Sequence, residues 1–476
     1  MEWTKVRFIA FREYMRKLGF WFHEKGIAGS ARNTLASHDG WKCLRIGPYL
    51  MAGLLSASLL TGCLLPTRSA SYSKDHAYIT YSPRPEGSDA LRLAVKDLID
   101  VKGSVTTGGS RYLKETSPPA KRDAACLRIA REKGVWINGK TNLGELGTGV
   151  SGANDYYGTP LNPLHPKYRY VPGGSSSGSA VAVATGMADV ALGTDTAGSI
   201  RIPAACCGVV GMKTTFGVVP RRGVIPLSPH LDTVGPLARD VSRLAQGMEL
   251  LEPDFAESYG AARAEHPTAH SIRVGRLVVP GTDARIDEAV DEALAKAGFR
   301  VVKLSPEFTK DWQLAQSDGK RVAEGDAWIT DNRYLNQKGI SDLAKAAIRL
   351  GHLEYQTNYA PALSRQAAWK RELRRVFQKV DLIATPTLKK LPPRISHFGR
   401  SAPLELRVLD IENTDAVNFG GNPALAMPIP LKDAPLPVTS LQLIGPPRSE
   451  AAILNAGRIV EAKSGKLRWS PAANTP

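Results

Sequence analysis

The chain has 476 residues, and 43% of them are apolar, which is enough to bury a large hydrophobic core. The formal net charge of +17 at pH 7 would suit a nucleic acid or an anionic membrane, but after residue 63 no Lys/Arg run with interleaved aromatic residues stands out to support nucleic-acid binding. The five cysteines are too few for a disulfide scaffold, and none forms a C-x-x-C pair. We therefore expect a globular protein without a metal ion, a cofactor or a nucleic-acid partner.

The first 45 residues form an N-terminal extension that is rich in Arg, Lys and aromatic residues and carries no motif that we can assign. A secretory signal rarely has so long a segment before it. One hypothesis is a start codon assigned too far upstream, with translation beginning near residue 44. N-terminal sequencing of the unprocessed precursor tests it.

Residues 46–63 contain no charged side chain and follow Lys42 and Arg45, which is the layout of a secretory signal. The end of this stretch, Leu60-Thr61-Gly62-Cys63, resembles the lipobox of bacterial lipoproteins, and the resemblance implies that Cys63 is the lipidated N-terminus of the mature protein. Two alternatives remain open, an uncleaved transmembrane anchor and a hydrophobic helix of a soluble protein.

Residues 64–76 are interpreted as a tether, because the stretch from Pro66 to His76 is polar and contains proline. With a lipid or an anchor at its start, the protein would lie on the outer side of the cytoplasmic membrane, in the periplasm of a Gram-negative cell. Its oligomeric state is not indicated by the sequence.

From residue 77 to 476 we expect the main domain. Residues 91–95 predict a strand that ends at Lys96, residues 121–133 a helix, and residues 135–137 a second strand. Strands that alternate with helices indicate an α/β fold.

Residues 172–179 read Pro-Gly-Gly-Ser-Ser-Ser-Gly-Ser, which alone is typical of a flexible linker. A helix-like segment at 180–184 and a buried-strand pattern at 190–193 follow at once, so a linker is disfavoured. Ser199 then stands where a strand gives way to a helix. The N–H groups of a first helical turn lack intrahelical partners and favour negative charge, which is how an oxyanion hole is built.

The run from Gly173 to Pro203 resembles the amidase signature, which marks a family of amide hydrolases and amidotransferases. Four further segments resemble the same family: Val95–Asp97, Gly139–Leu143, Val380–Thr387, and Gly421–Ala424 with Leu441–Leu443. The resemblance spans roughly residues 80–465 and is weakest between about 250 and 375. It implies one large α/β domain with a mixed central β-sheet flanked by helices.

The resemblance also implies a catalytic set. Ser199 would be the nucleophile, Ser175 the bridging serine in a cis peptide, and Lys96 the general base. The backbone N–H groups of Thr196, Ala197 and Gly198 would hold the oxyanion. A lysine acts as a base only when it is neutral, so we expect Lys96 to be buried at a strand end with hydroxyl groups nearby.

Each assignment has a competitor. Lys140 is a second lysine at a strand end, and Ser176 and Ser177 compete with Ser175. Ser199 could be an ordinary helix-capping serine. Asp195 could belong to a Ser-His-Asp triad, but no histidine lies in these motifs, so we expect it to anchor the turn through backbone hydrogen bonds.

Three functions are compatible with the sequence. The first is a free-standing amidase that cleaves a linear carbon–nitrogen amide bond in a small molecule. The second is the glutaminase-like component of a tRNA-dependent amidotransferase, which the export-type segment disfavours. The third is a non-catalytic binding relative, which the intact Lys96, Ser175 and Ser199 disfavour. The region from about 271 to 379 does not reveal the substrate.

Overall fold

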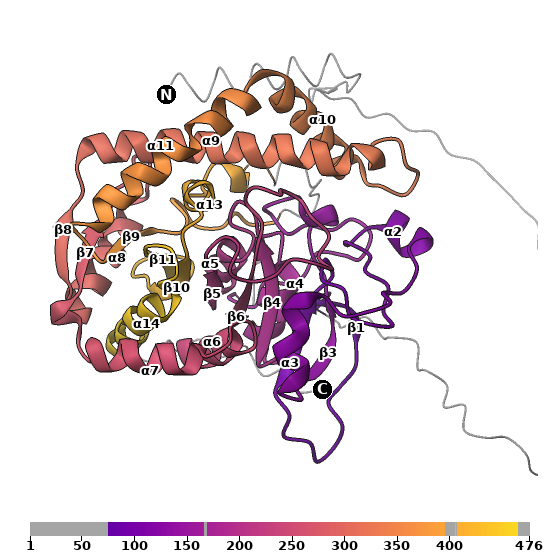
Figure 1. The fold of residues 1–476 in the computed structure, drawn as a ribbon, viewed down its shortest axis with the longest axis horizontal. Coiled ribbons are helices and arrows are strands. Elements are labelled where there is room, and N and C mark those ends of the chain that lie inside the picture. The colour runs from indigo at the N-terminus through magenta and orange to yellow at the C-terminus, as the bar shows by residue number, and fades with distance from the viewer. Residues whose placement is uncertain (1–74, 166–168, 396–404, 406, 465–476) are drawn as a thin grey trace, which may run out of the picture. The chain divides into compact units, whose positions relative to one another are not determined.

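The computed structural model describes residues 75–165, 169–395, 405 and 407–464 (Figure 1). The N-terminal extension, the signal-like segment with Cys63, and residues 64–74 of the tether lie outside these described residues. Within them, no helix combines the length and the apolar character needed to cross a bilayer.

The described residues form one α/β body around an 11-stranded mixed sheet, which confirms the expected fold class. The strands are, in spatial order, β1 (Tyr78–Tyr81), β3 (Trp136–Thr141), β2 (Arg92–Lys96), β4 (Val190–Asp195), β6 (Thr233–Ala238), β5 (Val210–Lys213), β10 (Ala424–Pro430), β11 (Val438–Ile444), β9 (Leu382–Pro386), β7 (Arg273–Arg276) and β8 (Arg300–Lys303). Strands β3, β2 and β4 run parallel, as do β9, β7 and β8. The strands between these two groups pair antiparallel, from β4–β6 through β11–β9.

Helices cover both faces of the sheet. One face carries α3 (Arg128–Glu132), α6 (Val241–Glu249), α8 (Ala284–Ala297) and α14 (Glu450–Ser464), with α7 (Phe255–Glu265) packed on α14. The other carries α4 (Ser177–Ala184), α5 (Arg201–Cys207), α13 (Asp415–Gly420), α9 (Pro306–Asp331) and α11 (Tyr359–Phe377). Helix α10 (Asp342–Thr357) packs on α9, and the two lie together with α11 along the upper side of Figure 1.

The short elements complete the described chain. They are α2 (Arg111–Thr116) and the 3₁₀ turns η1 (Ala125–Leu127), η2 (Glu145–Gly147), η3 (Ala269–Ser271) and η4 (Asn332–Tyr334).

Strand β10 shows why the sheet needs helices on both faces. Leu425, Met427 and Ile429 join the core under α8 and α14. Ala424 and Ala426 belong to the cores on the opposite face. Since successive side chains of a strand point to opposite faces, a strand that is apolar at every position must be covered twice.

The predicted helix over 121–133 is wrong in its first half. Only η1 and α3 form, because the N–H groups of Ala124 and Ala125 donate to the carbonyls of Asp100 and Arg222 instead of helical partners. Helix α8, by contrast, has clear signals at both of its ends. Asp283 caps its first turn, and Gly298 adopts the left-handed conformation, with φ 83°, that ends many helices.

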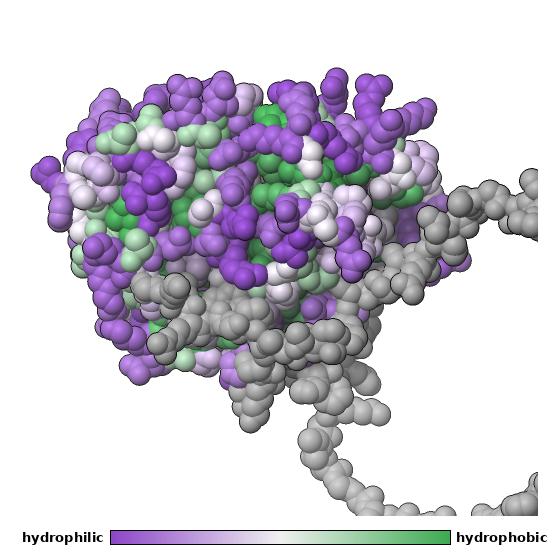
Figure 2. Space-filling model, turned by 90° about the horizontal axis from the view of Figure 1, so that it is seen from below, coloured by the Kyte–Doolittle hydropathy of each residue, from purple (hydrophilic) through white to green (hydrophobic). Residues whose placement is uncertain are grey.

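The face seen in Figure 2 carries hydrophilic residues around its rim, with hydrophobic residues between them nearer the middle. Such a mixture is ordinary, since apolar atoms make up more than half of most protein surfaces. The visible part of this face therefore marks no functional site by itself.

Candidate active site

Lys96 ends strand β2 and is completely buried. Its Nζ lies 2.8 Å from the Ser175 hydroxyl and 2.8 Å from the Thr194 hydroxyl. Among the described residues, no carboxylate forms an ion pair with it. Its burial among hydroxyl groups agrees with the expectation from the sequence.

This environment favours the neutral amine. Burial lowers the pKa of Lys96 from 10.5 to about 7, although the negative charges of Asp195 and Asp232 oppose the shift. A lysine with a pKa near 7 is unprotonated in about half of the molecules at neutral pH. Lys96 can therefore accept a proton where an ordinary lysine could not.

Ser175 lies in the turn that leads into α4, and the Gly174–Ser175 peptide bond is cis, as the family resemblance implies. Its hydroxyl is the one that contacts Lys96. The competing serines face elsewhere: Ser176 donates to the Thr194 carbonyl at 3.3 Å, and the Ser177 hydroxyl is buried without a described partner.

Ser199 lies two residues before α5 and is 7% exposed, while Ser175 is 1% exposed. The Ser176 N–H donates to the Ser199 carbonyl at 3.1 Å, so the backbone holds the two serine-bearing turns side by side. Within the described residues the Ser199 hydroxyl has no hydrogen-bond partner. The structure thus brings Lys96 and Ser175 into direct contact and places Ser199 next to them with a free hydroxyl.

Asp195 organises the turn between β4 and α5. One carboxylate oxygen accepts from the Gly198 N–H at 2.9 Å, and the other accepts from the Ile200 N–H at 3.1 Å. Burial alone would raise the pKa of Asp195, but the ion pair with Arg201 outweighs it and holds the pKa well below its usual range. Asp195 is therefore an anchor of the turn, as expected, and no histidine among the described residues forms a hydrogen bond or an ion pair with it.

The same bonds constrain the predicted oxyanion hole. Because the Gly198 N–H points to Asp195, the N–H groups of Thr196 and Ala197 are the members of the predicted set without a described partner. Gly198 has φ 129°, and a Cβ there would overlap Thr414. Only glycine fits this position.

Arg201 is a residue whose importance the sequence analysis missed. It is fully buried, and besides Asp195 it donates to the Thr414 carbonyl at 3.1 Å and to the Gln442 side chain at 2.6 Å. A further bond reaches the Asn418 side chain. Gln442 stands between Leu441 and Leu443 in the buried strand β11, and an amide side chain between two leucines of a strand was the available signal.

Lys140, the competing lysine, has a different role. Its Nζ forms an ion pair with Asp97 at 2.7 Å and donates to the Thr106 hydroxyl at 3.1 Å. Since its charge is compensated inside the core, it is held as a structural cation.

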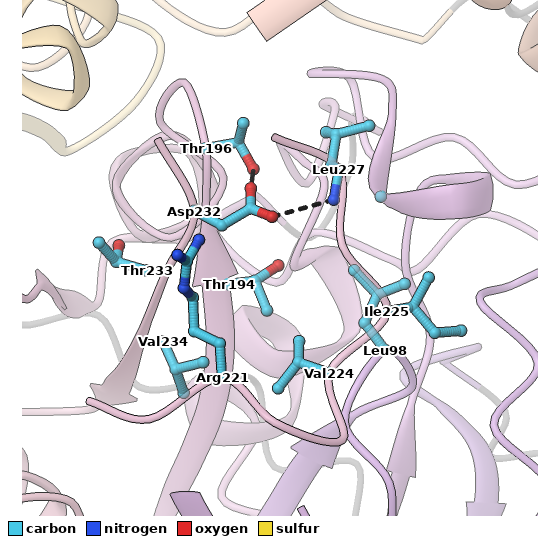
Figure 3. Close-up of a pocket in the computed structure, with 11 residues that line it drawn as sticks. Leu98, Thr194, Thr196, Arg221, Val224, Ile225, Leu227, Asp232, Thr233 and Val234 are labelled. Carbon is cyan, nitrogen blue, oxygen red and sulfur yellow. Dashed lines mark hydrogen bonds between the residues drawn. The ribbon is translucent and has the colours of Figure 1, made fainter. Parts of the chain in front are cut away.

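A cavity of about 10 Å³, enough for roughly one water molecule, lies beside Thr194. Figure 3 shows Thr194, Thr196, Asp232 and Arg221 around it. The complete lining is Leu98, Gly147, Thr194, Thr196, Arg221, Val224, Ile225, Leu227, Asp232, Thr233 and Val234.

The described cysteines are poor nucleophiles, because burial raises the pKa of Cys126 to about 12 and that of Cys206 and Cys207 well above 9.0. Among the described residues, no three His, Cys, Asp or Glu side chains lie together as a metal site. The reactive groups that the described site contains are therefore serine hydroxyls beside the buried amine of Lys96.

Comparison with known proteins agrees with this chemistry. The protein-family model described as Amidase matches residues 90–454. A glutamyl-tRNA(Gln) amidotransferase subunit from Halobacterium salinarum is 33% identical over 413 residues, covering 78% of this chain and 95% of the relative. The 2-amino-5-chloromuconic acid deaminase of Comamonas testosteroni is 35% identical over 392 residues, covering 79% and 82%.

Solved structures share the fold. The crystal structure of an amidase superposes with a TM-score of 0.64 at 30% identity, covering 79% of this chain and 85% of that chain. The corresponding glutamyl-tRNA(Gln) amidotransferase subunit from Thermotoga maritima superposes with a TM-score of 0.67 at 25% identity, covering 82% and 88%. With a family match over most of its length and relatives above 30% identity, this chain belongs to the amidase signature family of hydrolases.

Proposed function

We propose that the protein cleaves a carbon–nitrogen amide bond through an acyl-enzyme on Ser199. The observation that carries the proposal is the 2.8 Å contact between the Ser175 hydroxyl and the Nζ of Lys96, a completely buried lysine with no ion-pair partner among the described residues. Such an amine can take up a proton near neutral pH, which a serine nucleophile requires.

In the proposed reaction, Ser199 Oγ attacks the amide carbon while its proton passes through the Ser175 hydroxyl to Lys96 Nζ. The N–H groups of Thr196 and Ala197 donate to the oxyanion that forms. The proton then returns through Ser175 to the leaving nitrogen, and the C–N bond breaks. Water hydrolyses the ester on Ser199 and restores the free enzyme.

The test is amide turnover by the wild-type protein beside Ser199→Ala, with mass spectrometry of the intact protein for the acyl adduct. We expect turnover and the adduct to disappear together in Ser199→Ala. Ser177→Ala is the matched control, because its hydroxyl is buried nearby without a described partner, and this variant should keep both. Turnover that survives in Ser199→Ala would refute the assignment.

The substrate has two candidates. Most of the relatives found are named as a subunit of glutamyl-tRNA(Gln) amidotransferase, and this favours glutamine as the amide and ammonia transfer to a second reaction over a free-standing amidase. The deaminase relative favours a small molecule instead. Glutamine hydrolysis that is stimulated by Glu-tRNA and partner subunits would select the first candidate, and turnover of small amides without partners would select the second.

We also propose that the protein is exported and anchored through Cys63, on the strength of the uncharged run at residues 46–63 and its lipobox-like end. Metabolic labelling with a fatty acid should mark the wild-type protein and fail in Cys63→Ala. Recovery of the whole protein from the cytosol would refute this proposal and would favour the tRNA-linked function.

A further inference from the structure

Asp232 is a buried carboxylate that lines the cavity beside Thr194, the residue whose hydroxyl contacts Lys96. It is 7% exposed and accepts hydrogen bonds from the Thr196 hydroxyl at 2.5 Å and from the Leu227 N–H at 2.9 Å (Figure 3). A third bond comes from the Ser228 N–H at 3.0 Å. Three donors around one carboxyl group favour its ionised form. Burial nevertheless raises the pKa of Asp232 above its usual value, and these donors, with the charge of Arg221, limit the rise.

The two carboxylates whose charges act on Lys96 differ in how they are compensated. Asp195 forms an ion pair with Arg201 at 2.9 Å. Asp232 forms no ion pair among the described residues, and Arg221 acts on it only from a longer distance across the cavity. The field of Asp232 is therefore the less screened of the two at Lys96.

Two threonine hydroxyls near the end of β4 each contact one of the two groups. Lys96 Nζ contacts the Thr194 hydroxyl at 2.8 Å, and the Thr196 hydroxyl contacts Asp232. Thr194 and Thr196 are two residues apart at the end of β4, so their side chains point to the same side, opposite to Asp195. Both line the cavity that Asp232 also lines.

We propose that Asp232 is a positioning residue, whose charge stabilises the ammonium group that Lys96 becomes when it takes up the proton of Ser199. This inference rests on the proposed function. The proton moves from Ser199 Oγ through Ser175 Oγ to Lys96 Nζ and later back to the leaving nitrogen. Asp232 stays ionised throughout and forms no bond with the substrate.

The other charged groups around Asp232 belong to the loop before β6 and to α9. Arg221 partly compensates its charge, while Asp331 of α9 interacts with it unfavourably. His230 and Asp326 form a separate pair at 3.0 Å, and Asp326 also accepts from the Ser228 hydroxyl. Asp326 thus holds the same loop through its pair with His230, and it is not among the charges that shift the pKa of Lys96.

The experiment compares Asp232→Asn with Asp326→Asn. The rate at which a fluorophosphonate labels Ser199 is measured from pH 5 to 9, and the Lys96 side chain is titrated by NMR of its ¹³C-labelled ε-carbon. Asp232→Asn should move both midpoints to lower pH by about one unit, the effect of removing one buried charge nearby. The plateau labelling rate should fall about tenfold, since a weaker base accepts the proton less readily.

Asp326→Asn should leave both midpoints in place, because it loosens the loop without changing the charge at Lys96. Asp232→Glu keeps the negative charge, so both of its midpoints should lie closer to those of the wild-type protein than the midpoints of Asp232→Asn do. If Asp232→Asn does not fold, Arg221→Gln gives a test of opposite sign, because losing this cation should move the midpoints to higher pH. Unchanged midpoints in Asp232→Asn, or an equal shift in Asp326→Asn, would overturn the inference.

Different results would refute the proposed function and the proposed role of Asp232. A wild-type protein that is neither labelled at Ser199 nor active on any amide would refute the proposed function. The NMR titration of Lys96 needs no turnover, so it decides the effect of Asp232 in either case.

Discussion

Among the described residues, the lysines Lys96, Lys140 and Lys213 are buried, and their different hydrogen-bond and ion-pair partners give them different roles. Lys140 pairs with the Asp97 carboxylate and remains a structural cation. Lys213 donates to the carbonyls of Thr214 and Asn422 at 2.9 and 2.7 Å, and burial lowers its pKa to about 7. Lys96 contacts only hydroxyl groups, and one of them belongs to Ser175. Of the three lysines it alone can therefore exchange a proton with a serine that lies beside the candidate nucleophile Ser199.

The lowered pKa of Lys96 predicts how the activity should depend on pH. Because the neutral amine is the active form and the pKa of Lys96 is about 7, kcat/KM should rise with pH and reach half its plateau near pH 7. The measurement is the pH dependence of amide hydrolysis from pH 5 to 9. A half-maximum near pH 4 would instead indicate a carboxylate base.

Lys96→Met should reduce kcat by several orders of magnitude and remove the pH dependence near 7, since the variant has the volume of lysine without its amine. Its circular dichroism spectrum should match that of the wild-type protein. Retained activity in a folded Lys96→Met would rule out Lys96 as the base.

At the scale of elements, the turn from β4 to α5 is the critical connection. Asp195 receives N–H groups from the start of α5, and Arg201 ties that helix to α13 and β11. The nucleophile candidate Ser199 lies between these two residues. The Asp195–Arg201 pair therefore fixes the position of Ser199 without touching its hydroxyl.

Removing one side of this pair should be costly. Arg201→Ala leaves Asp195 buried without its cation, so we expect a loss of about 3–5 kcal/mol in the free energy of unfolding, measured by urea titration. Arg128→Ala breaks an exposed pair with Glu132 and should change stability by less than about 0.5 kcal/mol. Equal effects of the two substitutions would contradict this view of the turn.

Gly198→Ala tests the same turn through its backbone. The new methyl group would overlap Thr414 and displace the adjacent N–H groups, so kcat should fall by about a hundredfold or more, with a smaller change in KM. Gly217→Ala is the control, because Gly217 also has a positive φ of 83° but open space around its Cβ. This control should lose some stability and keep its activity.

The sequence predicted the parts of the site that are local along the chain. The strand that ends at Lys96 and the turns around Ser175 and Ser199 each follow from short patterns. It did not predict the partners of Arg201, because Thr414, Asn418 and Gln442 are more than two hundred residues away and no spacing rule connects them. Contacts between distant residues also explain why the helix predicted at 121–133 is wrong. The N–H groups of Ala124 and Ala125 donate to the carbonyls of Asp100 and Arg222, which are far away in the sequence.

At the scale of the whole molecule, stability should depend on pH through buried acids. Burial raises the pKa of Asp331 from 3.8 to about 8, and its Oδ2 has no described hydrogen-bond partner. The folded state therefore holds this proton more tightly than the unfolded state does. The stabilising contribution is complete below pH 4 and is lost as the pH rises to about 8.

Asp331→Asn should remove this dependence. Its free energy of unfolding, relative to that of the wild-type protein, should increase between pH 4 and 8 with a slope of up to about 1.4 kcal/mol per pH unit. Urea titrations of both proteins at several pH values measure it. A difference that stays constant over this range would show that Asp331 titrates normally.

The contacts of Arg201 with residues far along the chain have a consequence for the order in which the site forms during synthesis. Its partners Thr414, Asn418 and Gln442 are synthesised last, together with the strands β10 and β11 that fill the middle of the sheet. A nascent chain that already carries Lys96, Ser175 and Ser199 cannot yet hold the turn in place. We therefore expect a chain that is truncated before residue 442 to carry Lys96, Ser175 and Ser199 without the contacts of Arg201 that position Ser199.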